Sequence, residues 1–259
     1  MQTGSWRVVL AVGTVCGFAW MARGEQAAPT PVGATLDMPV LSAYVWRGQV
    51  INDEAVVQPS LTVTKGGFSL NAWGNLNLTD AVTDDAMEFS EIDLTAAYSY
   101  KVGAVGLGAG YIEYLFPQQT LNAEAYPGTR EVYASIGLPD LVVVPSLSVY
   151  YDFDEAQGVY AVASLGYTHA CAERLSLALN TSIGFASEDY NAYYFGVDEA
   201  AFNDVNAGAA LTWKVCDTLS ITPAVQYTML VDGDIRDAAG GLYKDKDQVV
   251  GSLRLSYTF

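Results

Sequence analysis

The last residues of the chain alternate strictly between apolar and polar side chains, up to the final position. In the segment QVVGSLRLSYTF, the two sets are Leu253, Leu255, Tyr257 and Phe259, and Ser252, Arg254, Ser256 and Thr258. A period of two indicates a β-strand with one apolar and one polar face. Terminal residues usually fray unless something holds them, so a strand that ends on Phe259 is expected to pair with another strand.

Residues 1–24 have the organisation of an export signal. Arg7 precedes the apolar run VVLAVGTVCGFAW, and Ala22 and Gly24 are small residues at the spacing of a cleavage site. This run is shorter than the ~20 residues of a membrane-spanning helix, and a retained anchor is the alternative. Residues 25–35, rich in Pro and Ala, are predicted to be a periplasmic linker, and residues 36–259 the folded domain.

The composition combines two properties that rarely occur together in a soluble exported protein. Hydrophobic residues make up 51% of the chain, yet its formal net charge is -17. This acidity excludes nucleic acid as a partner, because phosphates would be repelled. Downstream of the signal, no apolar run is long enough for a transmembrane helix. Hydrophobicity hidden in alternating segments is typical of a transmembrane β-barrel.

The chain divides into amphipathic segments of the length that a tilted strand needs to cross a bilayer. They are 36–47, 55–65, 67–78, 88–101, 103–115, 129–138, 141–153, 157–168, 174–186, 203–215, 218–230 and 247–259. Short connections such as KGG alternate with longer acidic ones such as VDGDIRDAAGGLYKDK. Outer-membrane barrels have this asymmetry, with short periplasmic turns and longer extracellular loops, whereas a soluble β-sandwich does not require it. We predict one domain, an all-β, 12-stranded antiparallel up-and-down transmembrane β-barrel.

Two parts of the sequence resemble known bacterial patterns. The alternation that ends in Tyr257 and Phe259 resembles the recognition signal of the outer-membrane barrel assembly machinery. The motif Tyr44-Val45-Trp46-Arg47-Gly48, with the following segments GGFSLNAWGNL and EIDLTAAYSY, resembles the exported Gcw_chp family of conserved hypothetical barrels. The resemblance implies a β-barrel in the bacterial outer membrane and leaves the activity open.

The phase of the alternation places several charges inside the barrel. If Tyr44 and Trp46 belong to the aromatic girdle at the lipid interface, Arg47 on the same strand points into the lumen. The inward charges predicted in this way are Arg47, Glu91, Asp93, Glu131 and Arg254. One interpretation is an ion-pair network that holds a narrow barrel in register. The other is a charged constriction that selects solutes.

Cys171 and Cys216 fall in two predicted turns on the same rim of the barrel. The periplasm is oxidising, so a disulfide between them is one hypothesis. The other hypothesis is that both remain free thiols because they lie too far apart to bond.

The sequence contains little that indicates catalysis or a cofactor. The only histidine, His169, lies in a predicted turn, away from any serine and acid that could complete a triad. The segment DGDIRD has oxygen ligands but lacks the turn glycine and final glutamate of a calcium loop. The neighbouring aromatics of another long loop suggest either a binding surface or an interfacial belt: Tyr190, Tyr193, Tyr194 and Phe195. We predict no enzyme activity, no metal and no cofactor.

These features favour a narrow channel for passive diffusion of small solutes, biased toward cations by its acidic mouth. The alternative is a non-conducting structural or surface-binding barrel, plugged by the inward charges. The expected partners are outer-membrane lipid, the barrel assembly machinery and small solutes.

Overall fold

The computed structural model describes residues 31–82, 86–117, 120–121, 124–125 and 128–259. The predicted signal, 1–24, lies outside the described residues. The first strand begins at Gly33. The strand thus begins before residue 36, the predicted start of the folded domain. The last residues of the predicted linker are therefore part of the barrel wall.

In the described part of the chain, twelve antiparallel strands close into a barrel. They are β1 (Gly33–Leu41), β5 (Ser60–Lys65), β6 (Phe68–Asn77), β7 (Glu88–Val102), β8 (Val105–Leu115), β11 (Thr129–Gly137), β12 (Val143–Asp152), β13 (Val159–Ala172), β14 (Leu175–Ala186), β15 (Ala201–Lys214), β16 (Leu219–Leu230) and β17 (Asp247–Thr258). The two-residue strand β4 (Val56–Val57) also pairs with β1 and β6 and extends the wall beside β5. The predicted architecture is confirmed.

Pairing of the two ends of the chain closes the sheet. Leu36 of β1 lies opposite Tyr257 of β17, and the register continues to Leu41 opposite Ser252. Beyond β17, the Phe259 N–H donates to the Ala34 carbonyl at 3.0 Å. The final strand is ordered to its last residue because each of its edges has a hydrogen-bonded partner, β16 on one side and β1 on the other.

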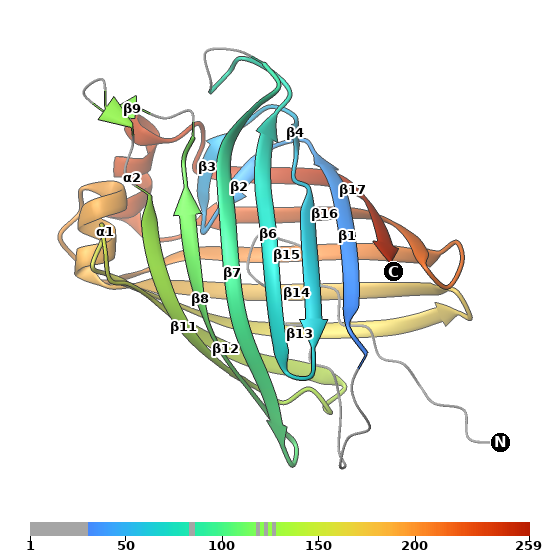
Figure 1. Ribbon diagram of the computed structural model, residues 1–259. Helices are drawn as coiled ribbons and strands as arrows, with labels where there is room; N and C mark the ends of the chain where they lie inside the picture. Colours follow the sequence, from blue (N-terminus) through green and yellow to red (C-terminus); the bar gives the residue numbers. More distant parts are fainter. Residues whose placement is uncertain (1–30, 83–85, 118–119, 122–123, 126–127) are drawn as a thin grey trace.

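The connections differ between the two ends of the barrel (Figure 1). Tight turns join the strands at one end, here called the turn end, where the C-terminus also lies. The other end, the loop end, carries α1 (Glu188–Phe195), α2 (Gly233–Leu242) and the short strands β9 (Thr120–Leu121) and β10 (Glu124–Ala125). Neither of these described helices has the length and apolar character needed to cross a membrane.

The outer face of the barrel is apolar and banded. Exposed aromatic side chains ring the turn end, including Phe68, Tyr98, Trp213 and Tyr257, and the loop end, including Phe89, Phe153, Phe202 and Tyr227. Exposed aliphatic side chains lie between them, including Leu94, Leu165, Leu179 and Val225. An apolar band between two aromatic girdles is the surface that a bilayer covers.

The inner face is polar and changes character along the barrel. Near the middle of their strands, inward side chains such as Ser148, Asn180 and Ser252 remain partly exposed. Toward the loop end, inward side chains such as Glu131 and Tyr160 are buried. The barrel is therefore filled at its loop end and more open near its middle, whereas Ala210, Thr212 and Thr222 on β15 and β16 are again buried toward the turn end.

The first predicted strand, 36–47, is wrong at its C-terminal end. Strand β1 stops at Leu41, and the chain then leaves the wall to form a hairpin of β2 (Tyr44–Trp46) and β3 (Gln49–Asn52). Tyr44 and Trp46 are consequently not part of the lipid girdle. Tyr44 is buried, and Trp46 packs against Tyr114, Tyr190 and Tyr194. Alternation alone cannot distinguish a hairpin that folds inward from a strand that continues in the wall.

We predict that Leu179→Arg lowers the free energy of unfolding by about 2–4 kcal/mol, because Leu179 faces lipid near the middle of β14. The neighbouring Asn180→Arg, on the inner face, should cost far less. Urea unfolding in lipid vesicles measures both. Equal losses in the two variants would contradict the assignment of the faces.

Candidate functional site

The tip of the β2–β3 hairpin is a two-residue turn made by Arg47 and Gly48. Trp46 pairs with Gln49, and φ is 47° at Arg47 and 82° at Gly48. Both residues are therefore in the left-handed region that tight hairpin turns require. A Cβ on Gly48 would lie 2.6 Å from Leu230 Cδ2 and 2.7 Å from Asp204 Cβ, so glycine is the residue that fits. The Arg-Gly pair thus projects a guanidinium from the tip.

This hairpin is attached to the barrel mainly by side chains. Strands β2 and β3 form a two-stranded sheet of their own, separate from the ladder of the wall. One backbone hydrogen bond reaches β3 from the loop after α2, where the Lys244 N–H donates to the Val50 carbonyl at 3.1 Å. The hairpin can therefore be regarded as an insertion inside the barrel, whose removal would leave the wall hydrogen bonds intact.

Arg47 forms a bidentate ion pair with Glu131 of β11. Arg47 Nη1 and Nη2 donate to Glu131 Oε1 and Oε2, each at 2.7 Å. The side chains of Arg47 and Glu131 are 5% and 1% exposed. The Tyr114 hydroxyl donates to Glu131 Oε2 at 2.8 Å and fixes the carboxylate from β8. Two parallel charged hydrogen bonds shielded from water hold the hairpin tip against the wall.

Aromatic rings surround the same guanidinium. Arg47 Cζ lies 4.5 Å from the ring centroid of Trp46, 4.6 Å from Tyr150 and 4.5 Å from Tyr160. The ring of Tyr190, on α1, lies 5.8 Å away. Cations are attracted to aromatic faces at these distances, and more strongly where water is excluded. We call Glu131, Trp46, Tyr150, Tyr160 and Tyr190 the Arg47 cage.

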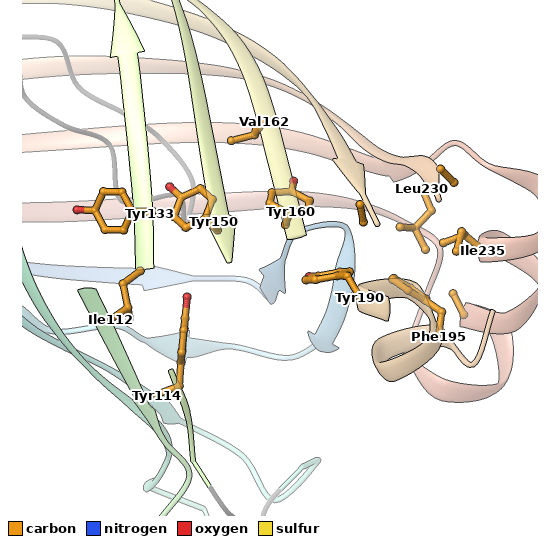
Figure 2. Close-up of a cluster of buried hydrophobic side chains, with 13 residues drawn as sticks. Ile112, Tyr114, Tyr133, Tyr150, Tyr160, Val162, Tyr190, Phe195, Leu230 and Ile235 are labelled. Carbon is orange, nitrogen blue, oxygen red and sulfur yellow. The ribbon is translucent and has the colours of Figure 1, made fainter. Parts of the chain in front are cut away.

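The tyrosines of the cage belong to a row that runs along the inner face of the barrel, from one strand to the next (Figure 2). Tyr133, Tyr150 and Tyr160 are directly opposite one another on β11, β12 and β13, and Tyr190 continues the row onto α1. The inward residues predicted from the sequence did not include Tyr150 and Tyr160. A signal was present, because both tyrosines are in phase with the serines of their strands rather than with the leucines.

A second acidic group lies beside the hairpin. The Tyr44 hydroxyl donates to Glu91 Oε2 at 2.7 Å, and Glu91 is buried. Asp93 follows on the same strand, and its Oδ1 is buried without a hydrogen-bond partner among the described residues. The structure thus places Glu91 and Asp93 against the base of the hairpin and Glu131 against its tip.

Arg254 is separate from this arrangement. It faces inward on β17, opposite Pro39 and Thr222, where the lumen is partly exposed. Among the described residues it forms no ion pair with the carboxylates around the hairpin. Of the five predicted lumen charges, the structure therefore brings Arg47 to Glu131 and leaves Arg254 apart.

Comparison with known proteins places the chain in a family. The model of a family described as "Bacterial protein of unknown function (Gcw_chp)" matches residues 25–253. This chain is a member of the Gcw_chp family. No curated protein matches it.

Solved structures with a similar fold are outer-membrane channels. The COG4313 outer membrane channel from Pseudomonas putida F1 has a TM-score of 0.51 at 12% identity, over 91% of this chain and 97% of the channel. The KdgM porin, in complex with disordered oligogalacturonate, has a TM-score of 0.51 at 9% identity, over 88% of this chain and 99% of the porin. The Gcw_chp protein is thus a porin-like barrel of the bacterial outer membrane. Short turns face the periplasm in such barrels, so we expect the turn end to be the periplasmic end.

The loop aromatics of this Gcw_chp protein pack inward. Tyr190 and Phe195 of α1 are buried in the core cluster, which also contains Leu230 and Ile235 (Figure 2). The expectation of a binding surface or an interfacial belt is therefore wrong for these two residues. Because the loop forms helix α1, these two side chains lie on one helix face that packs inward. The length of the loop alone does not indicate this helix.

The acidic segment DGDIRD starts a helix. Asp232 is the N-cap of α2, and its Oδ1 accepts from the N–H groups of Asp234 and Ile235 at 2.9 and 3.1 Å. Arg236 binds both oxygens of Asp247 at 2.8 Å. Helix capping and this ion pair account for Asp232 and Arg236 of the segment. Over the described residues, no group of three or more His, Cys, Asp or Glu could hold a metal ion.

Cys171 and Cys216 are exposed free thiols at the turn end. Cys216 lies in the turn between β15 and β16, with its Sγ 3.4 Å from Thr218 Oγ1. This hydrogen bond lowers the pKa of the Cys216 thiol below its ordinary value. A lower pKa increases the thiolate fraction and hence the reactivity toward alkylating agents.

We expect iodoacetamide to alkylate both Cys171 and Cys216 in protein purified without reductant. Cys216 should remain reactive at a lower pH than an ordinary thiol, because its pKa is lowered. Mass spectrometry of the labelled peptides reports both results. A Cys171–Cys216 peptide that resists labelling would show that the disulfide forms instead.

We predict that Arg47→Met and Glu131→Gln each destabilise the protein by about 3–5 kcal/mol, because each leaves a buried charge unpaired. The double variant should lose less than the sum of the two. Chemical unfolding of all four proteins in the same vesicles gives the coupling energy. Additive losses would mean that the two side chains act independently.

Proposed function

We propose that this protein is a narrow channel for the passive diffusion of small solutes. The observation that supports this most directly is the inner wall near the middle of the strands, between the hairpin and the turn end. Inward side chains there include hydroxyls and amides that remain partly exposed, such as Ser148, Asn180 and Ser252. A barrel stabilised by a packed core would instead bury large apolar side chains there. The likeness to outer-membrane channels supports the same conclusion and favours a channel over an enzyme.

The hairpin would set the width of this channel at its extracellular end. It sits inside the barrel and is anchored there by side chains, above all by the Arg47–Glu131 pair. Solutes that pass must be small enough to move around the hairpin, or they must pass when it shifts. A constriction lined by charged and aromatic groups selects solutes by charge and by size.

The charges around the hairpin favour cations. Glu91 and Asp204 are buried near the hairpin, and Asp93 follows Glu91 on β7. Asp204 accepts hydrogen bonds from Tyr160 and Asn206, and Glu91 from Tyr44, whereas the guanidinium of Arg47 is engaged by Glu131. When the hairpin shifts, these carboxylates would line a narrow passage and raise the local concentration of cations there.

One observation favours a different function. The Arg47–Glu131 pair is buried and bidentate, as expected for a permanent plug. A plugged barrel would act as a structural or surface-binding protein. The two functions differ in whether the barrel conducts ions.

We predict discrete conductance steps when the purified protein is inserted into planar bilayers, and a larger conductance for Arg47→Ala. Loss of the guanidinium frees the hairpin tip and widens the passage. Under a salt gradient, the reversal potential should have the sign expected of a cation-selective channel. Arg130→Ala is the matched control, because Arg130 pairs with Glu113 and Asp154 at an exposed site outside the lumen.

Silence of the wild type and of an Arg47→Ala, Glu91→Ala variant would rule out the channel and establish the plugged barrel. Conductance that rises equally in Arg47→Ala and Arg130→Ala would show that the hairpin does not set the width. A reversal potential with the sign of an anion-selective channel would contradict the role of the lumen carboxylates.

A further inference from the structure

We propose that the Arg47 cage is a binding site for solutes that carry a guanidinium group, and that Arg47 is its internal occupant when no solute is present. This inference rests on the proposed channel function and names the solute class that the channel recognises. The cage supplies a bidentate carboxylate and several ring faces to one cation.

The barrel wall, rather than the hairpin, provides most of the cage. Glu131, Tyr150 and Tyr160 lie on β11, β12 and β13, which are held in register by the ladder of the sheet. Tyr114 of β8 donates to Glu131 independently of Arg47. Of the ring faces, the hairpin contributes Trp46. The wall would therefore keep its shape and its hydrogen-bonding groups if Arg47 moved away.

The chemistry of the cage selects a planar, forked cation. Both oxygens of Glu131 accept from different nitrogens of one guanidinium, which an ammonium cannot imitate with the same two parallel bonds. The ring faces of Tyr150 and Tyr160 lie 4.6 and 4.5 Å from the central carbon, at stacking distance for a flat cation. Glu131 is 1% exposed, so an empty cage would contain an unpaired buried carboxylate. A neutral molecule or an anion cannot relieve that charge.

The occupant is attached in a way that permits exchange. The hairpin has no ladder with the wall, and Arg47 itself has a φ of 47°, which L-residues adopt at a cost. A guanidinium solute would replace the bonds of Arg47 with equivalent ones, so the exchange leaves Glu131 paired throughout. The hairpin would then relax and widen the passage.

Polar side chains line part of the inner face on the turn-end side of the cage. On β12, Ser146 and Ser148 precede Tyr150 on this face, and both remain partly exposed. On β13, the buried Val162 lies between Tyr160 and the partly exposed Ser164. A small hydrated cation would therefore approach the tyrosine row along the hydroxyl groups of β12.

The test uses Arg47→Ala, which empties the cage, in detergent micelles. Millimolar guanidinium chloride should raise its Tm by about 3 °C, because the ion binds the folded state and pairs with Glu131. Equal concentrations of sodium chloride and of urea, a neutral molecule of similar shape, should not. In the double variant Arg47→Ala, Glu131→Gln, the guanidinium effect should disappear.

Heat-dependent migration in a detergent gel first confirms that each variant is a folded barrel. If the Glu131→Gln variant fails this control, Arg47→Ala, Tyr150→Leu replaces it, since the loss of a ring face should also reduce the effect. A guanidinium response equal to that of sodium chloride, or one that survives both second substitutions, would overturn the proposed site.

Planar bilayers extend the test to the wild type. For the wild type, guanidinium chloride should give a larger current than an equimolar mixture of sodium chloride and urea. For Arg47→Ala, guanidinium chloride should reduce the current, because the ion occupies the empty cage. The Tm experiment needs no conduction. If guanidinium raises the Tm of Arg47→Ala but the protein does not conduct in bilayers, the channel is refuted and the binding site stands. If the protein conducts but guanidinium does not raise the Tm of Arg47→Ala, the binding site is refuted and the channel stands.

Discussion

The structure depends on one constraint: within hydrocarbon, every backbone N–H and carbonyl needs a partner in the protein. A sheet meets this condition when it has no free edge, and here the pairing of β1 with β17 removes the last one. The constraint explains why the chain is ordered up to Phe259, whose N–H is also bonded to the wall. It also makes the wall rigid, so that groups projecting from it into the lumen have fixed positions.

The hairpin escapes this constraint because it lies inside the barrel. Its own two strands satisfy part of its backbone, and its side chains make the contacts with the wall. Charged and polar groups that lipid would reject can gather there, and the wall supplies Glu91 and Glu131 to receive Tyr44 and Arg47. The motif Tyr44-Val45-Trp46-Arg47-Gly48 thus acquires a structural role: the aromatic residues pack, the arginine pairs and the glycine allows the turn.

Much of the fold could be predicted because a bilayer imposes a simple rule on each residue of a strand. Leu175, Leu177 and Leu179 had to face one way and Asn180 and Ser182 the other, and the alternation of short and long connections indicated the direction of each strand. The helices were missed for the opposite reason. Segments outside the bilayer obey no such rule, so the capping role of Asp232 and the burial of Phe195 emerged from the packing of the loops.

For the candidate site, the sequence by itself determined which side of each strand carries Glu91, Asp93, Glu131 and Arg254, since the period of two decides this locally. Only the tertiary structure decided that the chain leaves the wall after Leu41, and that Arg47 therefore meets Glu131 while Arg254 remains apart. The reason is physical. The face of a side chain is a property of its own strand, whereas a contact across the lumen depends on where a folded insertion places its tip relative to strands far away in the sequence.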